Sequence, residues 1–269
     1  MDEKPPAPTG AAAPARGKLP LLYRRIEPLN AQRHADVKLR NPTDFALARG
    51  VGAIPVTLGE FAIVARQYPI IFLATRTDAP PLAAAALGTN PNENLFVGAD
   101  GRWLPGFYVP AYLRRLPFIT GDTADSVRKA VYLDVESERV SREEGAALYE
   151  NGELSKLGRT AIEFCRQYHG QVLGTAPFNG ALAAAAVLTR RFYPDVGGAK
   201  PQRSSPTFLA VDEQKLAAVP DATFLDWRAK GWLGMVYLHL FSLAHFASFE
   251  KLKQRRAAEA ATATPMGTA

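Results

Sequence analysis

The most constraining feature of this sequence is the run from Trp232 to Phe249, eighteen residues without a formal charge between Lys230 and Glu250. Its length is sufficient for a helix to cross a bilayer. Against a membrane span, the run contains one glycine, two serines and two histidines, and it follows amphipathic segments that need a covering partner. We therefore expect a helix that is buried in the core or joins copies of the chain into a homo-oligomer through residues 232–249. We expect no membrane span.

A second helical pattern precedes this run. Apolar residues between Leu157 and Val172 recur at the spacing of one face of an α-helix, which predicts a packed stripe. The members of the stripe are Leu157, Ala161, Phe164, Cys165, Tyr168 and Val172. A separate helix is predicted over residues 178–186. The C-terminal half is therefore expected to be mainly helical.

The segment between these helices predicts a hairpin and two short helices. Residues 187–193 and 207–211 have the composition of two strands, and residues 194–206 are rich in glycine, proline and serine, as loops are. Asp212 is placed to cap a short helix, because its carboxylate can accept from free backbone N–H groups. Pro220 predicts the start of another helix, since its fixed φ suits the first turn.

The N-terminal half predicts strands alternating with short helices. Thr57 and Glu60 have the spacing of a capping box, in which each side chain satisfies a free backbone donor of a helix start. The apolar run at 70–73 is typical of a buried strand. Further strands are predicted at 21–26, 82–87, 94–97 and 127–135, with a turn at 98–101.

Taken together, these patterns predict an α+β fold, with a mixed β-sheet in the N-terminal half and a buried C-terminal helix after it. With 47% hydrophobic residues, a chain of 269 residues can bury one large core. We expect one domain over residues 19–253. Residues 1–18 are rich in alanine and proline and predict a disordered leader, and residues 254–269 predict a disordered tail.

Cysteine and charge restrict the compartment and the partners. The single cysteine, Cys165, excludes an intramolecular disulfide framework, and the N-terminus lacks the apolar core of a secretory signal, so we expect a cytoplasmic protein. Much of the net charge of +6 lies near the C-terminus, in Lys251, Lys253, Arg255 and Arg256. Such a basic end is usually solvated, so nucleic acid is not an expected partner.

No motif in the sequence predicts a cofactor or a metal. Residues 50–55 approach a phosphate-binding loop, but they lack the third glycine and a helix directly behind it. His239 and His245 are six residues apart, which places them on different faces of a helix rather than together as ligands. We therefore expect no bound cofactor and no metal site.

Two sets of polar residues are candidates for function. His34 lies in a polar stretch, and Asp134 and Glu136 alternate at a strand end, where two carboxylates on one face can share a proton. We favour the simpler interpretation of that pair, which is two solvated carboxylates at a sheet edge. In the second set, aromatic and basic residues alternate as in a surface for an anionic ligand. It consists of Tyr108, Tyr112, Arg114 and Arg115. Packed tyrosines and solvated arginines are the alternative there.

The order of several blocks resembles the bacterial SapC family over about residues 20–250. The N-terminal blocks are Tyr23 to Asn30 with His34, Ile54-Pro55, Tyr68-Pro69-Ile70, Glu93 to Val97, Gly101-Arg102-Trp103, and Tyr108 to Arg115 with Pro117-Phe118. The C-terminal blocks are Val211-Asp212-Glu213, Leu216, Gly231-Trp232-Leu233, Tyr237-Leu238-His239 and Ser242-Leu243. The resemblance implies one α+β domain and, through the family's name, a connection with bacterial surface-layer proteins. It implies no catalytic residue.

These observations favour a non-catalytic accessory or interaction protein, linked to processes at the bacterial cell surface. Its expected partner is a protein, and the apolar C-terminal helix is the expected contact surface. The alternative is an enzyme that uses His34 with Asp134 or Glu136. The two hypotheses differ in one structural requirement, because the enzyme needs these side chains to converge in one place.

Overall fold

The computed structural model describes residues 19–40, 43–74, 79–122, 129–193 and 206–263. The leader predicted at 1–18, most of the loop at 194–206 and the last residues of the tail lie outside the described residues. The chain divides into two compact units. Unit 1 comprises Met1–Asn41 and Arg115–His169, and unit 2 comprises Pro42–Arg114 and Gly170–Ala269. Each unit has its own sheets and its own buried residues.

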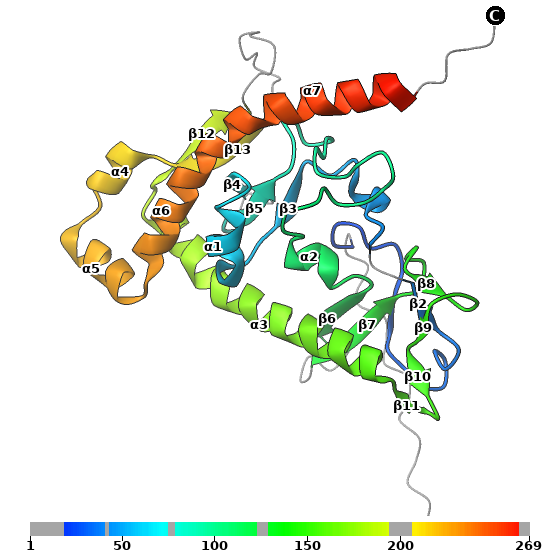
Figure 1. Cartoon of the computed structure of the whole chain (residues 1–269). Helices are drawn as coiled ribbons and strands as arrows, with labels where there is room; N and C mark the ends of the chain where they lie inside the picture. The colour runs from blue at the N-terminus through cyan, green and yellow to red at the C-terminus, as the bar shows by residue number, and fades with distance from the viewer. Residues whose placement is uncertain (1–18, 41–42, 75–78, 123–128, 194–205, 264–269) are drawn as a thin grey trace, which may run out of the picture. The chain divides into compact units, whose positions relative to one another are not determined.

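Unit 1 is built on a three-stranded antiparallel sheet in the order β1-β7-β6 (Figure 1). Its strands are β1 (Ile26–Pro28), β6 (Phe118–Asp122) and β7 (Lys129–Asp134). A small sheet and a hairpin complete the unit, formed by β2 (Lys38–Leu39), β8 (Val140–Ser141), β9 (Ala146–Ala147), β10 (Tyr149–Glu150) and β11 (Glu153–Leu154). The unit's hydrophobic core consists of Val37, Leu39, Phe118, Val131, Leu133, Leu148, Ile162 and Cys165.

Unit 2 is built on a five-stranded antiparallel sheet in the order β12-β13-β4-β5-β3. Its strands are β3 (Ala53–Pro55), β4 (Ile70–Leu73), β5 (Leu82–Ala86), β12 (Leu188–Phe192) and β13 (Thr207–Val211). The predicted hairpin is confirmed, with Leu188 opposite Val211 and Phe192 opposite Thr207. The central strands β4 and β5 are almost entirely buried, which explains their uninterrupted apolar sequences.

The helices of the chain are short except for α3 and the C-terminal pair. They are η1 (Ala46–Ala48), η2 (Leu58–Glu60), α1 (Phe61–Val64), α2 (Ala111–Arg114), α3 (Lys156–Ala184), α4 (Glu213–Ala217), α5 (Asp221–Ala229), α6 (Trp232–Ser242), η3 (Leu243–His245) and α7 (Phe246–Ala263). The capping box of Thr57 and Glu60 is present at the start of η2. Asp212 caps α4 by accepting from Gln214 N and Lys215 N.

The strands predicted at 94–97 and 21–26 differ from the structure. Residues 94–97 form no strand, and Val97 makes only an isolated bridge to Trp103, because the turn at 98–101 reverses the chain at once. The first strand begins at Ile26, since Leu21 and Leu22 lie in a turn. In the predicted strand at 127–135, the first two residues lie outside the described residues, and the remainder forms β7.

Helix α3 continues through both segments that predict separate helices. Its buried side includes Ile162, Cys165 and Tyr168, while Leu157 and Val172 at the ends of the predicted stripe are 43% and 36% exposed. The stripe therefore packs in its middle and reaches solvent at its ends. A sequence pattern identifies the apolar side of a helix, but the neighbouring elements decide how much of that side they cover.

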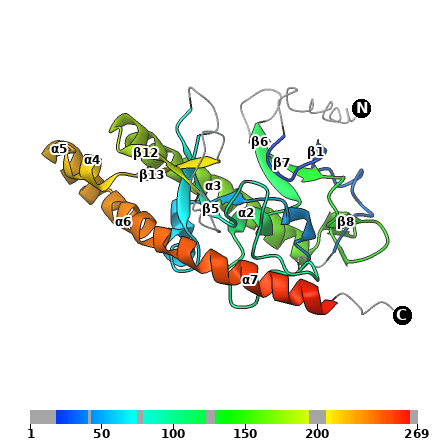
Figure 2. The same ribbon diagram turned by 90° about the horizontal axis from the view of Figure 1, so that it is seen from above.

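The C-terminal helix packs on the sheet of unit 2 along one side only. Helix α6 contacts β4 and β13, and α7 continues to Ala263, beyond the boundary predicted at residue 253 (Figures 1 and 2). The buried row of this helix is Val236, His239, Ser242, Phe246 and Phe249. By length and composition alone, Trp232–Ala258 is the one helix among the described residues that could cross a membrane. Hydrogen bonds between the sheet and the side chains of His239 and Ser242 are instead those of a helix fixed on a protein core.

Candidate functional site

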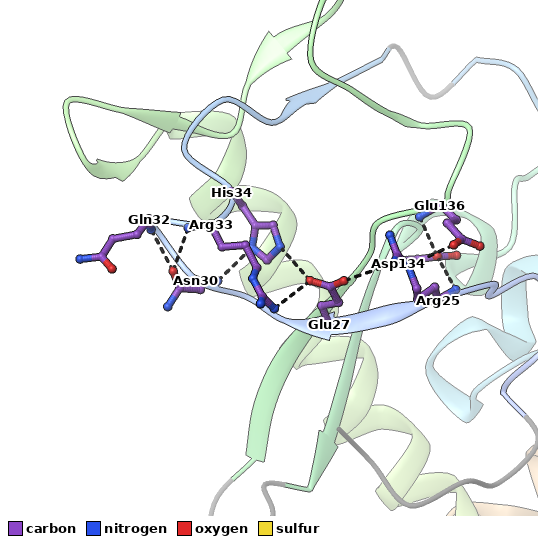
Figure 3. Close-up of polar contacts among 8 residues, drawn as sticks. All are labelled: Arg25, Glu27, Asn30, Gln32, Arg33, His34, Asp134 and Glu136. Carbon is purple, nitrogen blue, oxygen red and sulfur yellow. Dashed lines mark hydrogen bonds and ion pairs between the residues drawn. The ribbon is translucent and has the colours of Figure 1, made fainter. Parts of the chain in front are cut away.

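His34 lies in a turn of unit 1 that Asn30 shapes. The Asn30 side-chain oxygen accepts from Gln32 N and Arg33 N at 2.9 Å each, which closes the turn after β1 (Figure 3). The backbone N–H of His34 donates to Asn30 O at 3.0 Å. The turn buries His34, which is only 2% exposed. A polar stretch in the sequence therefore places a histidine inside the protein.

The hydrogen bonds of the His34 ring determine its chemical form. Nδ1 accepts from Asn30 N at 3.1 Å, so the neutral ring carries its proton on Nε2. Nε2 is buried, has no hydrogen-bond partner among the described residues, and lies 3.9 Å from Glu27 Oε2. Burial lowers the pKa of His34, and the Glu27 carboxylate opposes that shift. Since Nδ1 is occupied and Nε2 holds the proton, this ring is poorly arranged to bind a metal.

Asp134 is fully buried at the end of β7, and its carboxylate accepts hydrogen bonds from backbone N–H groups. Its carboxylate accepts from Arg24 N at 3.0 Å, Arg25 N at 2.9 Å and Glu136 N at 3.2 Å. These bonds hold the start of β1 against the end of β7, where Ile26 pairs with Asp134. The prediction of two solvated carboxylates is therefore wrong for Asp134, because the chain entering β1 covers it.

Glu136 is half-exposed and pairs with Arg25, whose Nε lies 3.0 Å from Glu136 Oε1. Arg25 also lies 3.8 Å from Glu27, so it links the two ends of the cluster in Figure 3. Within the described residues, no hydrogen bond or ion pair joins His34 to Asp134 or Glu136. The carboxylate beside His34 is Glu27 instead.

Sequence reasoning missed Glu27 because spacing carries little information across a turn. Glu27 lies in β1 and His34 lies seven residues later, beyond the turn at Asn30. Because a turn lies between them, the seven-residue separation does not place the two side chains on one face of a helix or a strand. The available signal was Asn30, whose side chain commonly closes turns and so returns the chain towards the strand it has left.

The second predicted set is divided between the two units. In unit 2, Arg114 Nη2 donates to the Tyr108 hydroxyl at 2.6 Å, and that hydroxyl donates to Glu60 Oε1 at 3.0 Å. Burial, followed by the charge of Glu60, raises the pKa of Tyr108 to about 12. Tyr112 is buried, 4% exposed, and belongs to the core rather than to a surface.

Arg115 belongs to the interior of unit 1. Its guanidinium lies 4.6 Å from the ring centroid of Tyr168 and 5.5 Å from that of Tyr23, and the residue is 8% exposed. Such placement lets the aromatic faces stabilise a buried cation. Two of the four candidate residues, Tyr112 and Arg115, are therefore buried.

The described residues contain no group of three or more histidine, cysteine, aspartate or glutamate side chains that could hold a metal ion. Cys165 is buried, and burial raises the pKa of its thiol to about 11. A thiol with such a pKa is almost entirely protonated at neutral pH and is a poor nucleophile.

Four exposed large hydrophobic side chains of unit 2 lie on α5 and α6. Phe241 is 76% exposed and Leu225 is 51% exposed, with Tyr237 at 44% and Phe224 at 36%. We call Phe224, Leu225, Tyr237 and Phe241 the outer apolar surface. Helices α5 and α6 pack against each other, and α6 is held by its buried row. Exposed apolar groups on a fixed element are typical of a contact surface.

Comparison with known proteins gives one match. A family model described as SapC matches residues 29–249. No curated protein and no solved structure matches the chain.

Proposed function

The chain belongs to the SapC family, and from this premise we propose that it is a non-catalytic accessory protein that acts by binding, in processes at the bacterial cell surface. The observation that carries the proposal is the outer apolar surface, above all Phe241 at 76% exposure. Helix α6 holds this aromatic side chain in water. A partner that covers the side chain would gain binding free energy, because apolar surface is removed from water.

The polar candidates support binding rather than catalysis. Asp134 is occupied by three backbone donors, and Arg25 separates Glu136 from Glu27 and His34. A general base needs an accessible lone pair near its substrate. His34 instead has its proton on the nitrogen that faces Glu27. The alternative, an enzyme that uses His34 with Asp134 or Glu136, needs these side chains to meet, and no hydrogen bond or ion pair among the described residues joins His34 to either carboxylate.

The proposed cellular location and the proposed class of partner are inferred from the sequence. A cytoplasmic location is proposed because the chain has one buried cysteine, whose thiol needs no oxidising compartment. A protein partner and pairing of copies through residues 232–249 remain predictions. The proposed mode of action is contact with a partner through the outer apolar surface.

Affinity capture from a native bacterial lysate tests the proposal. The bait is the full chain, compared with a Phe241→Ser, Leu225→Ser variant, and the captured proteins and lipids are identified by mass spectrometry. We expect components that the wild type retains and the variant loses. A third bait with Phe192→Ser controls for loss of an exposed aromatic residue elsewhere, since Phe192 is 44% exposed on β12. Identical capture by all three baits contradicts the proposal.

A further inference from the structure

Strand β12 forms one edge of the five-stranded sheet of unit 2, and its only partner in that sheet is β13. Two backbone bonds flank the paired strands: Asp212 N donates to Val187 O at 2.9 Å, and Tyr193 N donates to Pro206 O at 3.3 Å. In an antiparallel strand, successive residues alternate between bonding to the partner strand and pointing away from it. The odd-numbered residues of β12 therefore face β13. The residues whose backbone groups point away from it are Leu188, Arg190 and Phe192.

The outer edge of β12 is largely open. At one end, Lys215 Nζ lies 3.5 Å from Leu188 O. Beyond that contact, the backbone N–H and C=O groups of Arg190 and Phe192 have no hydrogen-bond partner within the part of the chain that the structure describes. Backbone groups of this kind are a template to which another strand can bond.

The other edges of the two larger sheets are protected. Pro28 in β1 and Pro55 in β3 occupy outward positions of their strands, and proline has no N–H to offer a further strand. At the outer edge of β6, Phe118 O accepts from the Tyr23 hydroxyl at 2.6 Å. Among the described residues, β12 is thus the edge of these sheets that carries neither a proline nor a covering tyrosine.

Two arginines mark this open edge. Arg190 and Arg191 are both exposed, and neither forms an ion pair with a described residue. Successive side chains of a strand point to opposite faces of the sheet. The edge therefore presents one cation on each face of the sheet, beside the free backbone groups.

We propose that β12 binds an acidic, extended segment of a partner protein, which adds a strand to the five-stranded sheet. The backbone of β12 supplies the hydrogen bonds of strand addition. Glutamate or aspartate side chains of the incoming strand pair with Arg190 and Arg191, since opposite charges on neighbouring strands attract. This inference goes beyond the proposed function, because the edge shares no residue with the outer apolar surface.

Charge selects this partner over a second copy of the chain. When two copies of β12 pair about a two-fold axis at Arg190, that arginine lies opposite the same arginine of the second copy, and like charges directly opposite are destabilising. The arginines thus oppose self-pairing and leave the edge open to a strand of opposite charge. Anionic lipid and nucleic acid also attract arginine, but neither offers a row of N–H donors to the C=O groups of β12.

Selection from a library of displayed random peptides of about 12 residues tests the inference. The full-length protein is immobilised at about pH 7 in about 0.1 M salt. We expect enriched peptides in which acidic residues alternate with β-branched or aromatic residues, without proline between them. The most enriched peptide is then synthesised with a fluorescent label, and its affinity for the protein is measured by anisotropy.

Two variants at one position separate charge from backbone. Arg190→Thr removes the charge and keeps the outward N–H, and we expect it to weaken peptide binding about threefold. Arg190→Pro also removes the outward N–H but no bond to β13, and we expect it to weaken binding at least about fivefold more. Each variant must retain the wild-type unfolding midpoint.

A charge reversal tests the arginines together. Arg190→Glu with Arg191→Glu is expected to weaken binding of the acidic peptide at least about tenfold and to select basic peptides from the library instead. The matched control is Arg66→Glu with Lys251→Glu, two exposed positions away from β12. It changes the net charge equally and should leave the affinity within about twofold of the wild type.

Amide hydrogen exchange reports strand addition directly and needs no variant. With the peptide bound, the amides of Arg190 and Phe192 should exchange at least about tenfold more slowly, because they become bonded to the new strand. The amides of Thr189 and Arg191 already bond to β13 and should change less.

Five outcomes overturn the inference. They are no enrichment over the bare support, enriched peptides that are not acidic, equal affinity of Arg190→Pro and Arg190→Thr, unchanged exchange at Arg190 and Phe192, and a dimer in solution that Arg190→Pro dissociates. Each of them leaves the proposed function standing if affinity capture still depends on Phe241 and Leu225. The Phe192→Ser bait keeps the backbone of this edge, so it remains a control in that experiment.

Discussion

His239 replaces a pair of backbone hydrogen bonds between two strands. The antiparallel register sets Leu209 opposite Phe72, so Val211 lies opposite Ile70. Instead of bonding to each other, these residues bond to the histidine ring: Val211 N donates to Nε2 at 3.0 Å, and Nδ1 lies 2.8 Å from Ile70 O. Ser242 Oγ accepts from Ile70 N at 2.8 Å. Side chains of α6 thus complete the sheet where β4 and β13 separate.

This role makes stability depend on pH. The ring must stay neutral to accept from Val211 N, and burial lowers the pKa of His239 to about 4. The unfolded chain, with a pKa near the ordinary value of about 6.5, binds the proton first, so stability is complete above about pH 6.5 and falls towards pH 4. From pH 7 to pH 5 we expect this residue to cost about 2 kcal/mol of unfolding free energy. Urea unfolding at pH 7 and pH 5 measures this change in unfolding free energy. The variant His239→Asn should show only a small part of the change.

Asp134 is predicted to serve structure rather than chemistry. Asp134→Asn leaves one backbone donor facing an amide group, which should lower the free energy of unfolding by about 1–3 kcal/mol. The matched variant Glu136→Gln, which removes a half-exposed ion pair to Arg25, should cost less than about 1 kcal/mol. Urea midpoints compare the two. Equal costs contradict the assignment of Asp134 to the backbone of Arg24 and Arg25.

At the scale of elements, Glu60 joins the start of a helix to a distant segment. Its buried carboxylate accepts from the backbone N–H and hydroxyl of Thr57, from the Tyr108 hydroxyl at 3.0 Å and from Ala111 N at 2.7 Å. The capping box was visible in the sequence as a local pattern. The bonds to Tyr108 and Ala111 involve residues about fifty positions away, which no local pattern contains.

Replacing Glu60 should therefore cost more than the loss of a helix cap. Glu60→Gln is expected to lower the free energy of unfolding by about 2 kcal/mol, because hydrogen bonds to a charged acceptor are the stronger ones. Tyr108→Phe removes one of the donors and should cost about 1 kcal/mol. The exposed Glu250→Gln provides the control, with a change below about 0.5 kcal/mol. Thermal and urea unfolding of the three variants measure their losses of stability, which we expect to decrease from Glu60→Gln through Tyr108→Phe to Glu250→Gln.

At the scale of the whole molecule, the C-terminal helix decides how the protein meets its surroundings. Because the buried row of α6 is bonded to the sheet, we predict that the purified protein stays in the supernatant after ultracentrifugation without detergent. Recovery only from a detergent-extracted membrane fraction contradicts this prediction.

Local signals in the sequence determined much of the fold. The capping box at Thr57, the cap at Asp212, the strand at 70–73 and the hairpin at 187–211 depend on neighbouring residues or on their immediate periodicity. The α+β class follows from their order. These features were predictable because propensities and hydrogen bonds within a few residues are sufficient to favour them.

Tertiary structure decided which polar residues are buried and what they touch. A packing contact requires glycine at position 52, because an added Cβ would lie 2.0 Å from Asn90 O. Glu27 meets His34 only through a turn, and Lys253 and Arg256 bond to Thr89 and Asn94, more than 160 positions away in the sequence. Sequence determines what each residue can do, whereas distant contacts decide which of its groups remain available to water and partners.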